Sequence, residues 1–424
     1  MDKIKVLILG SGGREHVLAW KIAQSPSVEK IYCAPGNGGI ASLAQCIPIG
    51  VTDTEEIIRF AKSEDIDLVV VAPENPLAAG MVDELEKAGI RAFGPYKNAA
   101  VIESSKMFSK NLMKKYGIPT AAYEIFSDMD AAIEYLSGVR FPVVVKADGL
   151  ALGKGVIIAL DYEEAVKAVQ DMMSDKVFGS AGERVIVEEF LTGHEVSVLA
   201  FTDGKTLVPM VSAQDHKRAL DNDEGLNTGG MGAFSPSRFY TDELNTLCMK
   251  SIFMPTMEAM NKEGRTFKGV LYFGLILTDD GPKVIEYNCR FGDPEAQVVL
   301  PRLKTDIIEV INAIIDGRLD SVKIEWEDSA AVCVIMASGG YPGKYRTGLE
   351  ICGLEKAEES VGVVVFHAGT RLESGKHYTA GGRVLGVTAV ADTMDNARDK
   401  AYAAARCISF DDVHYRTDIG IKKD

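Results

Sequence analysis

The sequence lacks the close pairs of cysteine and histidine that build zinc sites and disulfide frameworks. Its seven cysteines are scattered over 424 residues without a Cys-x-x-Cys pair, and its six histidines form no His-Glu-x-x-His motif. Both kinds of site need such fixed, short spacings. The pattern therefore indicates neither a zinc protein nor a disulfide-stabilised secreted domain, and we expect a reducing, cytoplasmic setting.

Membrane-spanning and targeting segments are also missing. The apolar runs, such as residues 68–72, have the length of a strand, whereas a transmembrane helix needs about 20 apolar residues. A charged start leads directly into an expected strand, without the longer apolar stretch of a signal peptide. We expect a cytoplasmic protein with no membrane partner.

Positive charge is scarce as well. Lysine and arginine total 46 against 61 acidic residues, which gives a net charge of −15. This balance argues against nucleic acid as the main partner. It leaves small anionic substrates open, because local lysines, arginines and backbone amides can bind them. We expect small-molecule substrates and a monomer or weak homo-oligomer.

What is present is an ordinary globular composition, 46% hydrophobic and 25% charged, on a chain too long for one core. Apolar strands alternate with helices in the first hundred residues, which predicts a doubly wound parallel sheet. Later segments predict mixed α+β units, including a hairpin of strands 269–278 and 283–288. We expect four units: an α/β domain that binds the substrate phosphate (1–104), two α+β lobes (105–192 and 193–326) and a C-terminal α+β domain (327–424).

The strand expected at 283–288 carries the most informative polar pattern. Glu286, Asn288 and Arg290 occupy every second position, so an extended chain points them the same way. A carboxylate and an amide oxygen can share a hard cation, and a guanidinium can bind a carboxylate or phosphate beside it. A solvated edge strand is the alternative.

A glycine-rich turn between the first strand and helix predicts an anion site. Gly12 and Gly13 let the backbone approach an anion at a helix N-terminus. A dinucleotide fingerprint would need a third glycine at position 15, which is Glu15, and an acid after the second strand. Phosphate binding is therefore favoured over NAD binding, and a tight turn without a ligand is the alternative.

A second glycine-rich segment, residues 146–155, begins with Lys146 and contains Lys154. It lacks the spacing and the Lys-Ser/Thr ending of a Walker A motif. A flexible hairpin that closes over nucleotide phosphates fits, with Lys146 as a fixed charge. A plain surface hairpin is the alternative.

Two further segments are candidates for substrate contacts. The strand at 184–190 ends in Glu188 and Glu189, and Glu195 lies shortly beyond; the backbone there could bind an adenine edge and Glu195 a ribose. Residues 214–232 form a long polar stretch, which we expect to be a substrate loop without secondary structure. His216 in this stretch is better explained as structural than as a general base.

In this order the segments resemble the ATP-grasp carboxylate–amine ligases, and more closely the phosphoribosylamine–glycine ligase (glycinamide ribonucleotide synthetase) family. The resemblance rests most specifically on Asn-Thr-Gly-Gly-Met-Gly at 227–232 and Asn-Cys-Arg-Phe-Gly-Asp-Pro-Glu at 288–295. It implies that the two lobes form an ATP-grasp fold. It also implies ATP-dependent joining of glycine to 5-phosphoribosylamine through a glycyl phosphate, in purine biosynthesis, with one or two Mg²⁺ or Mn²⁺ ions.

The resemblance also implies roles for individual residues. Those expected to bind ATP are Lys106, Lys146, Lys154, Glu188, Glu189, Leu191 and Glu195. Those expected to bind glycine or phosphoribosylamine are Gly12, Gly13, Glu74, Asp215, Lys217 and Arg290. Glu286 and Asn288 would bind the metal, and Arg290, Asp215 and Lys146 would be catalytic.

One departure from the wider ATP-grasp pattern is Asn288, which stands where a second carboxylate is typical. One charge fewer should weaken intrinsic metal affinity, so we expect the ion to arrive with ATP. The alternatives to this function are another ATP-grasp ligase of the same pathway, a dinucleotide-binding oxidoreductase and a non-catalytic nucleotide-binding module.

Overall fold

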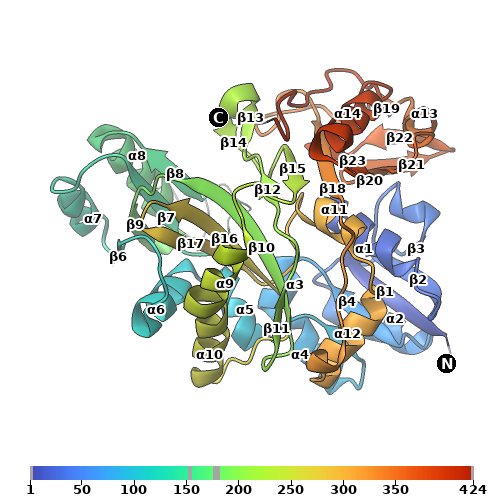
Figure 1. Cartoon of the computed structure of the whole chain (residues 1–424), viewed down its shortest axis with the longest axis horizontal. Helices are drawn as coiled ribbons and strands as arrows, with labels where there is room; N and C mark the ends of the chain where they lie inside the picture. Colours follow the sequence, from blue (N-terminus) through green and yellow to red (C-terminus); the bar gives the residue numbers. More distant parts are fainter. Residues whose placement is uncertain (1–2, 151–154, 175–181, 422–424) are drawn as a thin grey trace.

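The N-terminal part of the computed structural model is built on a parallel sheet (Figure 1); the structure describes residues 3–150, 155–174 and 182–421. Five strands follow the order β3-β2-β1-β4-β5, and all their pairings are parallel. This confirms the doubly wound sheet. Its elements are β1 (Ile4–Gly10), α1 (Gly13–Ile22), β2 (Val28–Pro35), β3 (Gln45–Cys46), α2 (Thr54–Ser63), β4 (Leu68–Val71), α3 (Glu74–Ala79), α4 (Met81–Lys87), β5 (Ala92–Phe93) and α5 (Lys97–Ser104).

The apolar pattern of residues 77–88 predicts a single helix, but the structure has two helices there, α3 and α4. Gly80 separates them with φ +99°, a left-handed conformation that a helix interior does not contain. The apolar period continues across the break, which is why the sequence pattern alone predicted a single helix.

The next unit, at the left of Figure 1, is an antiparallel sheet of order β6-β9-β7-β8 covered by helices. Its buried side chains form a hydrophobic cluster of their own, all within residues 126–187. Its elements are α6 (Lys106–Tyr116), β6 (Tyr123–Phe126), α7 (Met129–Leu136), β7 (Val143–Ala147), β8 (Val156–Ala159), α8 (Tyr162–Met173) and β9 (Val185–Glu189).

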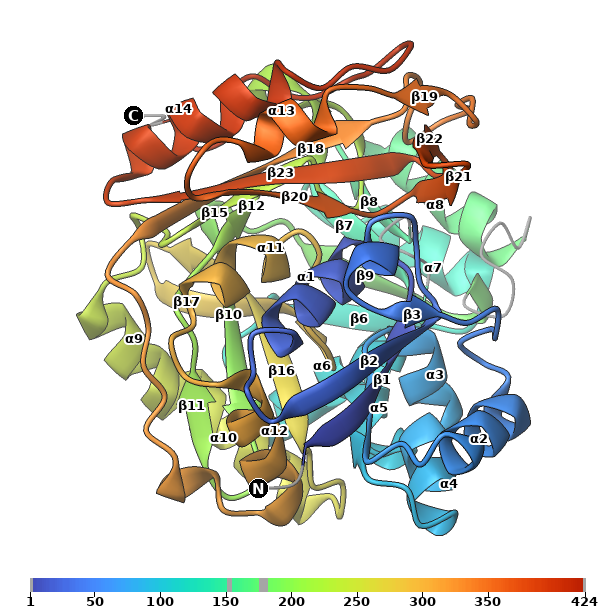
Figure 2. The same cartoon turned by 90° about the vertical axis from the view of Figure 1, so that its right-hand side faces the viewer.

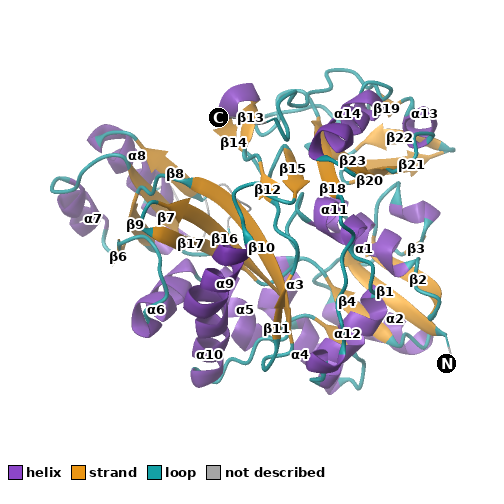
Figure 3. Cartoon of the chain, viewed as in Figure 1, coloured by secondary structure: helices purple, strands orange, loops and turns teal. Residues whose placement is uncertain are grey.

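A second antiparallel sheet, of order β11-β10-β16-β17, lies beside it (Figure 3). The expected hairpin is present, with its two strands meeting at Gly281. The elements of this lobe are β10 (His194–Thr202), β11 (Leu207–Pro209), α9 (Asp242–Cys248), a π-helical turn (Met249–Phe253), α10 (Met254–Lys262), β16 (Gly269–Thr278), β17 (Gly281–Asn288), α11 (Ala296–Val299) and α12 (Ile307–Asp316).

The polar stretch at 214–232 is not the plain loop expected from the sequence. It contains the short strands β12 (Gln214–Asp215), β13 (Arg218–Leu220) and β14 (Glu224–Asn227), and it leads into β15 (Gly232–Ser235). Strands β13 and β14 pair as a hairpin. Strands this short leave no measurable period in a polar sequence, which explains the difference.

The C-terminal sheet combines strands from two parts of the chain. Its order is β12-β15-β18-β23-β20, so β12 pairs with β15, and β15 pairs with the C-terminal strand β18. Helices α13 and α14 cover one face, and α1 and α11 lie on the other (Figure 2). The C-terminal elements are β18 (Ala330–Ala337), β19 (Glu350–Ile351), α13 (Leu354–Glu358), β20 (Val363–His367), β21 (Thr370–Glu373), β22 (Lys376–Thr379), β23 (Arg383–Ala391) and α14 (Met394–Ala405).

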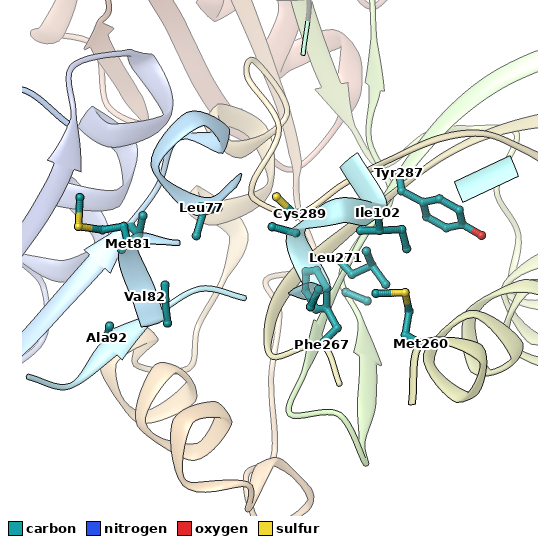
Figure 4. Packing of buried hydrophobic residues seen from close by; sticks show 14 of the residues in the cluster. Leu77, Met81, Val82, Ala92, Ile102, Met260, Phe267, Leu271, Tyr287 and Cys289 are labelled. Atoms are coloured by element: carbon teal, nitrogen blue, oxygen red, sulfur yellow. The ribbon is translucent and has the colours of Figure 1, made fainter. Parts of the chain in front are cut away.

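One hydrophobic cluster joins the N-terminal sheet to the β16–β17 hairpin. Figure 4 shows Leu77 and Val82 on one side of it and Leu271, Tyr287 and Cys289 on the other. Because these residues are buried together, helices α5 and α6 pack against strand β17. No helix among the described residues is long and apolar enough to cross a membrane.

Candidate active site

The floor of the site is strand β17, and a β-bulge sets which way its side chains point. Gly274 pairs with Glu286 and the next residue of β16 pairs with Val284, so one residue of β17 is extra. Val284 and Tyr287 are buried in the core on one face. Glu286 and Asn288 are partly exposed, on the other. The expected alternation is thus present at the end of the strand.

Glu286 lies in a strongly positive environment. Burial acts to raise its pKa, but Lys217, Lys146, Lys106 and Arg290 outweigh that effect and hold the pKa below its usual value. Glu286 is therefore a carboxylate at neutral pH, with lysines beside it that can bind phosphate oxygens.

Two buried lysines share one carboxylate at the back of this floor. Lys110 Nζ and Lys146 Nζ lie 2.8 and 3.0 Å from Glu188 Oε2, and Lys146 also donates to the backbone oxygen of Ile285 at 3.3 Å. Burial lowers the pKa of Lys110 to about 8, although Glu188 opposes the shift. Lys110 was not predicted from the sequence; its place one helical turn after Lys106 was the available signal.

Lys106 is held at the start of the glycine-rich segment. Its Nζ donates to the backbone oxygen of Gly149 at 2.9 Å, and Asp148 accepts from Ser105 Oγ and the backbone N–H of Met107. Burial lowers the pKa of Lys106, against the raising effect of Glu286. The expected phosphate contact Lys154 lies outside the described residues.

The residues expected around adenine lie at the end of β9. The backbone N–H of Glu189 donates to Ala122 at 3.0 Å, and Glu189 Oε1 accepts from the backbone N–H of Ala122 at 2.9 Å. The backbone N–H of Glu189 is thus already hydrogen-bonded within the protein. After β9 the chain continues through Leu191 to β10. Glu195, the expected ribose contact, is near the start of β10 and pairs with Lys217.

Lys217 lies between the carboxylates of Glu195, the expected ribose contact, and Glu286, the expected metal ligand. Its Nζ is 3.0 Å from Glu195 Oε2 and 3.9 Å from Glu286 Oε1. Beside it, burial raises the pKa of Asp215 to about 7, with Glu295 and other acids adding to the shift and Lys217 opposing it. The Lys217 ammonium thus offsets part of the negative charge of these acids.

Arg290 lies behind the floor in a network of buried charges. It pairs with Glu74 at 3.2 Å and with Glu103 at 3.0 Å. Burial favours a higher pKa for Glu74, but Arg290 and Arg14 outweigh it and lower that pKa to about 2. The two carboxylates fix the guanidinium where it closes the site toward the N-terminal sheet. Glu103 was not predicted from the sequence.

The glycine-rich turn meets the same network at the N-terminus of α1. The backbone N–H of Gly12 donates to Glu15 Oε2 at 2.5 Å, and that of Arg14 to Asp293 Oδ2 at 3.2 Å. A Cβ at Gly13 would lie 2.6 Å from Gln297 Nε2, so a side chain there would need its neighbour to move. A phosphate that binds these amides has to displace the two carboxylates.

The oxygen ligands suit magnesium or manganese better than zinc. Among the described residues, no group of three or more His, Cys, Asp and Glu side chains surrounds a common point. Glu286 with Asn288 fits a Mg²⁺ that takes its remaining ligands from phosphates and water, as is usual for nucleotide-bound Mg²⁺.

Comparison with known proteins matches the whole chain to one family. Family models described as the N, ATP-grasp (A) and C domains of phosphoribosylglycinamide synthetase match residues 4–103, 104–296 and 331–422. The phosphoribosylamine–glycine ligases of Escherichia coli K12 and Halalkalibacterium halodurans are each 49% identical to it; the alignments cover 98% and 99% of this chain, and 98% and 97% of theirs. The chicken trifunctional purine biosynthetic protein adenosine-3 is 53% identical over 99% of this chain, which spans only 42% of its length.

Solved structures agree. The Thermotoga maritima phosphoribosylamine–glycine ligase has a TM-score of 0.86 and 32% identity, covering 98% of this chain and 100% of its own. A Campylobacter jejuni biotin carboxylase, with a TM-score of 0.74 and 14% identity over 97% of this chain and 93% of its own, shares the fold. The chain belongs to the phosphoribosylamine–glycine ligase family, whose members are ATP-dependent ligases with an ATP-grasp domain.

Proposed function

We propose that the chain joins glycine to 5-phosphoribosylamine, with cleavage of ATP, to form glycinamide ribonucleotide, ADP and phosphate in purine biosynthesis. Full-length similarity to named ligases of this reaction supports the proposal. The observation that carries it is Glu286, which has the cations of Lys146, Lys106 and Arg290 around it and Asn288 two residues further along the same strand. Such a site can bind a metal–nucleotide and a small carboxylate side by side.

The reaction has two steps. A glycine carboxylate oxygen attacks the γ-phosphorus of ATP, a new P–O bond forms, the bond to the β-phosphate oxygen breaks, and ADP leaves. The amine of phosphoribosylamine then attacks the glycyl carbonyl, phosphate leaves with the C–O electron pair, and the nitrogen loses a proton. Both steps depend on positioning and charge neutralisation, without a covalent nucleophile from the protein.

On the ATP side, Lys106 and Lys146 bind phosphate oxygens, together with Lys154 of the glycine-rich segment. Glu188, Glu189 and Leu191 provide the adenine pocket, and the carboxylate of Glu195 accepts from the ribose hydroxyls. These assignments place ATP between the two antiparallel sheets. The domain limits expected from the sequence give the same division: 105–192 and 193–326 each provide one wall.

Glu286 and Asn288 would hold Mg²⁺ or Mn²⁺ through a carboxylate oxygen and an amide oxygen. The chemistry that such an ion would supply there is neutralisation of phosphoryl charge. With a single carboxylate in the pair, affinity depends on the nucleotide phosphates, so the metal and ATP bind together.

The acceptor side uses charges of both signs. Arg290 binds the glycine carboxylate, and Asp215, assisted by Lys217, orients the glycine ammonium. Gly12, Gly13 and Glu74 contact phosphoribosylamine. Its phosphate accepts from the backbone amides of the glycine turn in place of Glu15 and Asp293, which accept from them in the structure.

A coupled assay of ADP release tests the function. Glycine, ATP and freshly generated phosphoribosylamine are supplied together, and each is then omitted in turn, with Mg²⁺ or Mn²⁺. We expect release only with all three substrates, and a product with the mass of glycinamide ribonucleotide. Release that continues without glycine, or that requires formate or bicarbonate in its place, would show a different ligase of this fold.

A further inference from the structure

One carboxylate behind the metal floor accepts from three consecutive residues. Glu103 lies at the end of α5, and its side chain is 7% exposed. Its Oε2 accepts from the backbone N–H of Cys289 at 2.7 Å, and its Oε1 accepts from Arg290 Nη2 at 3.0 Å. The side-chain amide of Asn288 lies 3.0 Å from Oε1, and because a carboxylate can only accept, we assign its nitrogen to that side, where Nδ2 donates to Oε1.

These contacts determine the orientation of the Asn288 amide. The nitrogen donates to Glu103 and also to the backbone oxygen of Tyr287 at 3.2 Å, which satisfies both of its hydrogens. With this assignment the amide oxygen points away from Glu103 and faces only donor groups, the side on which a cation could bind. If the amide were reversed, its oxygen would face a carboxylate and its N–H groups would face the cation, which no cation tolerates.

The same carboxylate orients the group expected to bind glycine. Arg290 is held between Glu103 and Glu74, so two of the guanidinium's edges are fixed. A planar guanidinium anchored in this way offers its remaining N–H groups in one direction only. The carboxylate of Glu103 can thus orient both Asn288, expected to bind the metal, and Arg290, expected to bind glycine.

We propose that Glu103 is a positioning residue that sets the amide oxygen of Asn288 toward the metal and the guanidinium of Arg290 toward glycine. This inference rests on the proposed function. Glu103 touches neither substrate nor metal and acts only through its two neighbours. Its place on α5 couples the N-terminal domain to the geometry of the ATP site, because α5 is packed on β17 through the shared core.

The substitution Glu103→Gln tests the role of the carboxylate with little change of shape. The backbone N–H of Cys289 cannot rotate, so the glutamine keeps its oxygen there and presents its NH₂ group to Asn288 and Arg290. Asn288 then turns over and directs its own NH₂ toward the metal. Loss of a group that orients a metal ligand typically weakens metal binding roughly 10–100-fold.

We expect E103Q to weaken Mn²⁺ binding to the protein–ADP complex at least about tenfold. The electron paramagnetic resonance signal of free Mn²⁺ measures this binding. The KM for glycine should rise in parallel, while ADP binding without metal and the melting temperature change little. Glu64→Gln is the matched control, because Glu64 is a partly buried acceptor for Tyr32 in the N-terminal domain, outside the site.

The double variant E103Q/N288D provides the decisive arm. An aspartate at 288 can only accept, so the glutamine NH₂ at 103 suits it, whereas Glu103 itself would repel it. E103Q should therefore weaken Mn²⁺ binding in the Asn288 protein and strengthen it in the N288D protein. This reversal of sign requires direct contact between the two side chains.

A purely structural Glu103 would give a lower melting temperature and the same change in Mn²⁺ binding in both backgrounds, which overturns the inference. If the proposed function itself is wrong, the unsubstituted protein will show no glycine-dependent ADP release. That result differs from a failure of the inference about Glu103. The Mn²⁺ measurement with ADP does not need turnover and decides the role of Glu103 independently.

Discussion

Glu286 has three lysines and an arginine as its main electrostatic partners. Its replacement by glutamine keeps the shape of the side chain and removes the charge that would bind the metal. We expect E286Q to lower kcat by about 100-fold or more, the size found when one strong electrostatic contact to a transition state is lost. Steady-state rates with saturating ATP and glycine measure the effect.

The circular dichroism spectrum and melting temperature of E286Q should match the unsubstituted protein, because the side chain is partly exposed and packs against no core cluster. A kcat within a factor of a few of the original value would contradict the metal assignment.

We expect Lys217 to compete with the metal for the carboxylate of Glu286. Its ammonium is 3.0 Å from Glu195 and 3.9 Å from Glu286, and unit charges about 4 Å apart interact by about 1 kcal/mol even in water. In K217M we expect Mn²⁺ to bind without nucleotide about fivefold more tightly or better. Calorimetric titration with Mn²⁺ alone measures this.

Lys304→Met is the control for this change of net charge, because Lys304 pairs with Glu327 at an exposed position. Equal Mn²⁺ affinity in K217M and the unsubstituted protein would show that Lys217 does not compete with the metal for Glu286.

At the residue scale, the sequence predicted side chains whose roles follow from local spacing. Glu286 and Asn288 alternate along one strand, and Lys146 ends another, so both signals lie within a few positions. Glu103 and Lys110 were not predicted, because each is defined by a partner far along the chain: Cys289 for Glu103 and Glu188 for Lys110. A lone charge on a helix gives no sign of such a partner.

At the scale of elements, Arg383 at the start of β23 links three segments of the site. Its Nη1 donates to the backbone oxygens of Gly229 and Asp293 at 2.6 and 2.8 Å, and it pairs with Asp293 Oδ1 at 3.2 Å. The other oxygen of Asp293 accepts from the backbone N–H of Arg14 at the start of α1. The C-terminal sheet is thereby linked to the glycine turn expected to face phosphoribosylamine and to the end of the polar stretch at 214–232.

We therefore expect R383M to raise the KM for phosphoribosylamine about tenfold or more, since hydrogen bonds of charged groups are worth about 1.5–3 kcal/mol each. The KM for ATP should stay the same, because Arg383 contacts none of the ATP-side residues. Initial rates with each substrate varied in turn separate the two constants.

Arg371→Met is the matched control, because Arg371 is an exposed residue of β21 that pairs with Glu373. A rise in the KM for ATP instead of phosphoribosylamine would place the effect of Arg383 elsewhere in the site.

The sequence predicted the longer elements well, and missed those whose formation depends on distant partners. The parallel sheet and the β16–β17 hairpin follow from apolar runs and a turn sequence. Strands β12 and β15 have two and four residues, and β15 exists by pairing with β18, about 100 positions later. Tertiary pairing, not local propensity, defines them.

At the scale of the whole molecule, buried histidines join the two ends of the chain. The backbone N–H of His367 donates to His16 Nδ1 at 2.7 Å, which ties β20 to α1. Burial lowers the pKa of His16 to about 4 and that of His367 to about 2, with His16 and His377 adding to the second shift. Both histidines are therefore neutral in the folded protein over a range where they take up protons on unfolding.

The free energy of unfolding should consequently fall as the pH falls from about 6.5 toward 4, by up to about 1.4 kcal/mol per pH unit for each of the two histidines. Urea denaturation at pH 7, 6 and 5 measures the slope. In H16N the asparagine oxygen still accepts from His367 and does not titrate, so the slope should decrease by the share of one histidine.

His194→Asn, at an exposed position on β10, should leave the slope unchanged. An equal slope in H16N and the unsubstituted protein would show that His16 is not a source of the acid sensitivity.

The mixed C-terminal sheet has a consequence for how the enzyme is made. Strands β12 and β15 are synthesised about 100 residues before β18, the strand on which β15 depends for its pairing. During translation the segment that contains β12 and β15 must therefore wait, without its final neighbours, until residues 330–337 have left the ribosome. Arg383 and β23 follow later still, so glycine-dependent turnover is expected to arise only after residues 383–391 have left the ribosome.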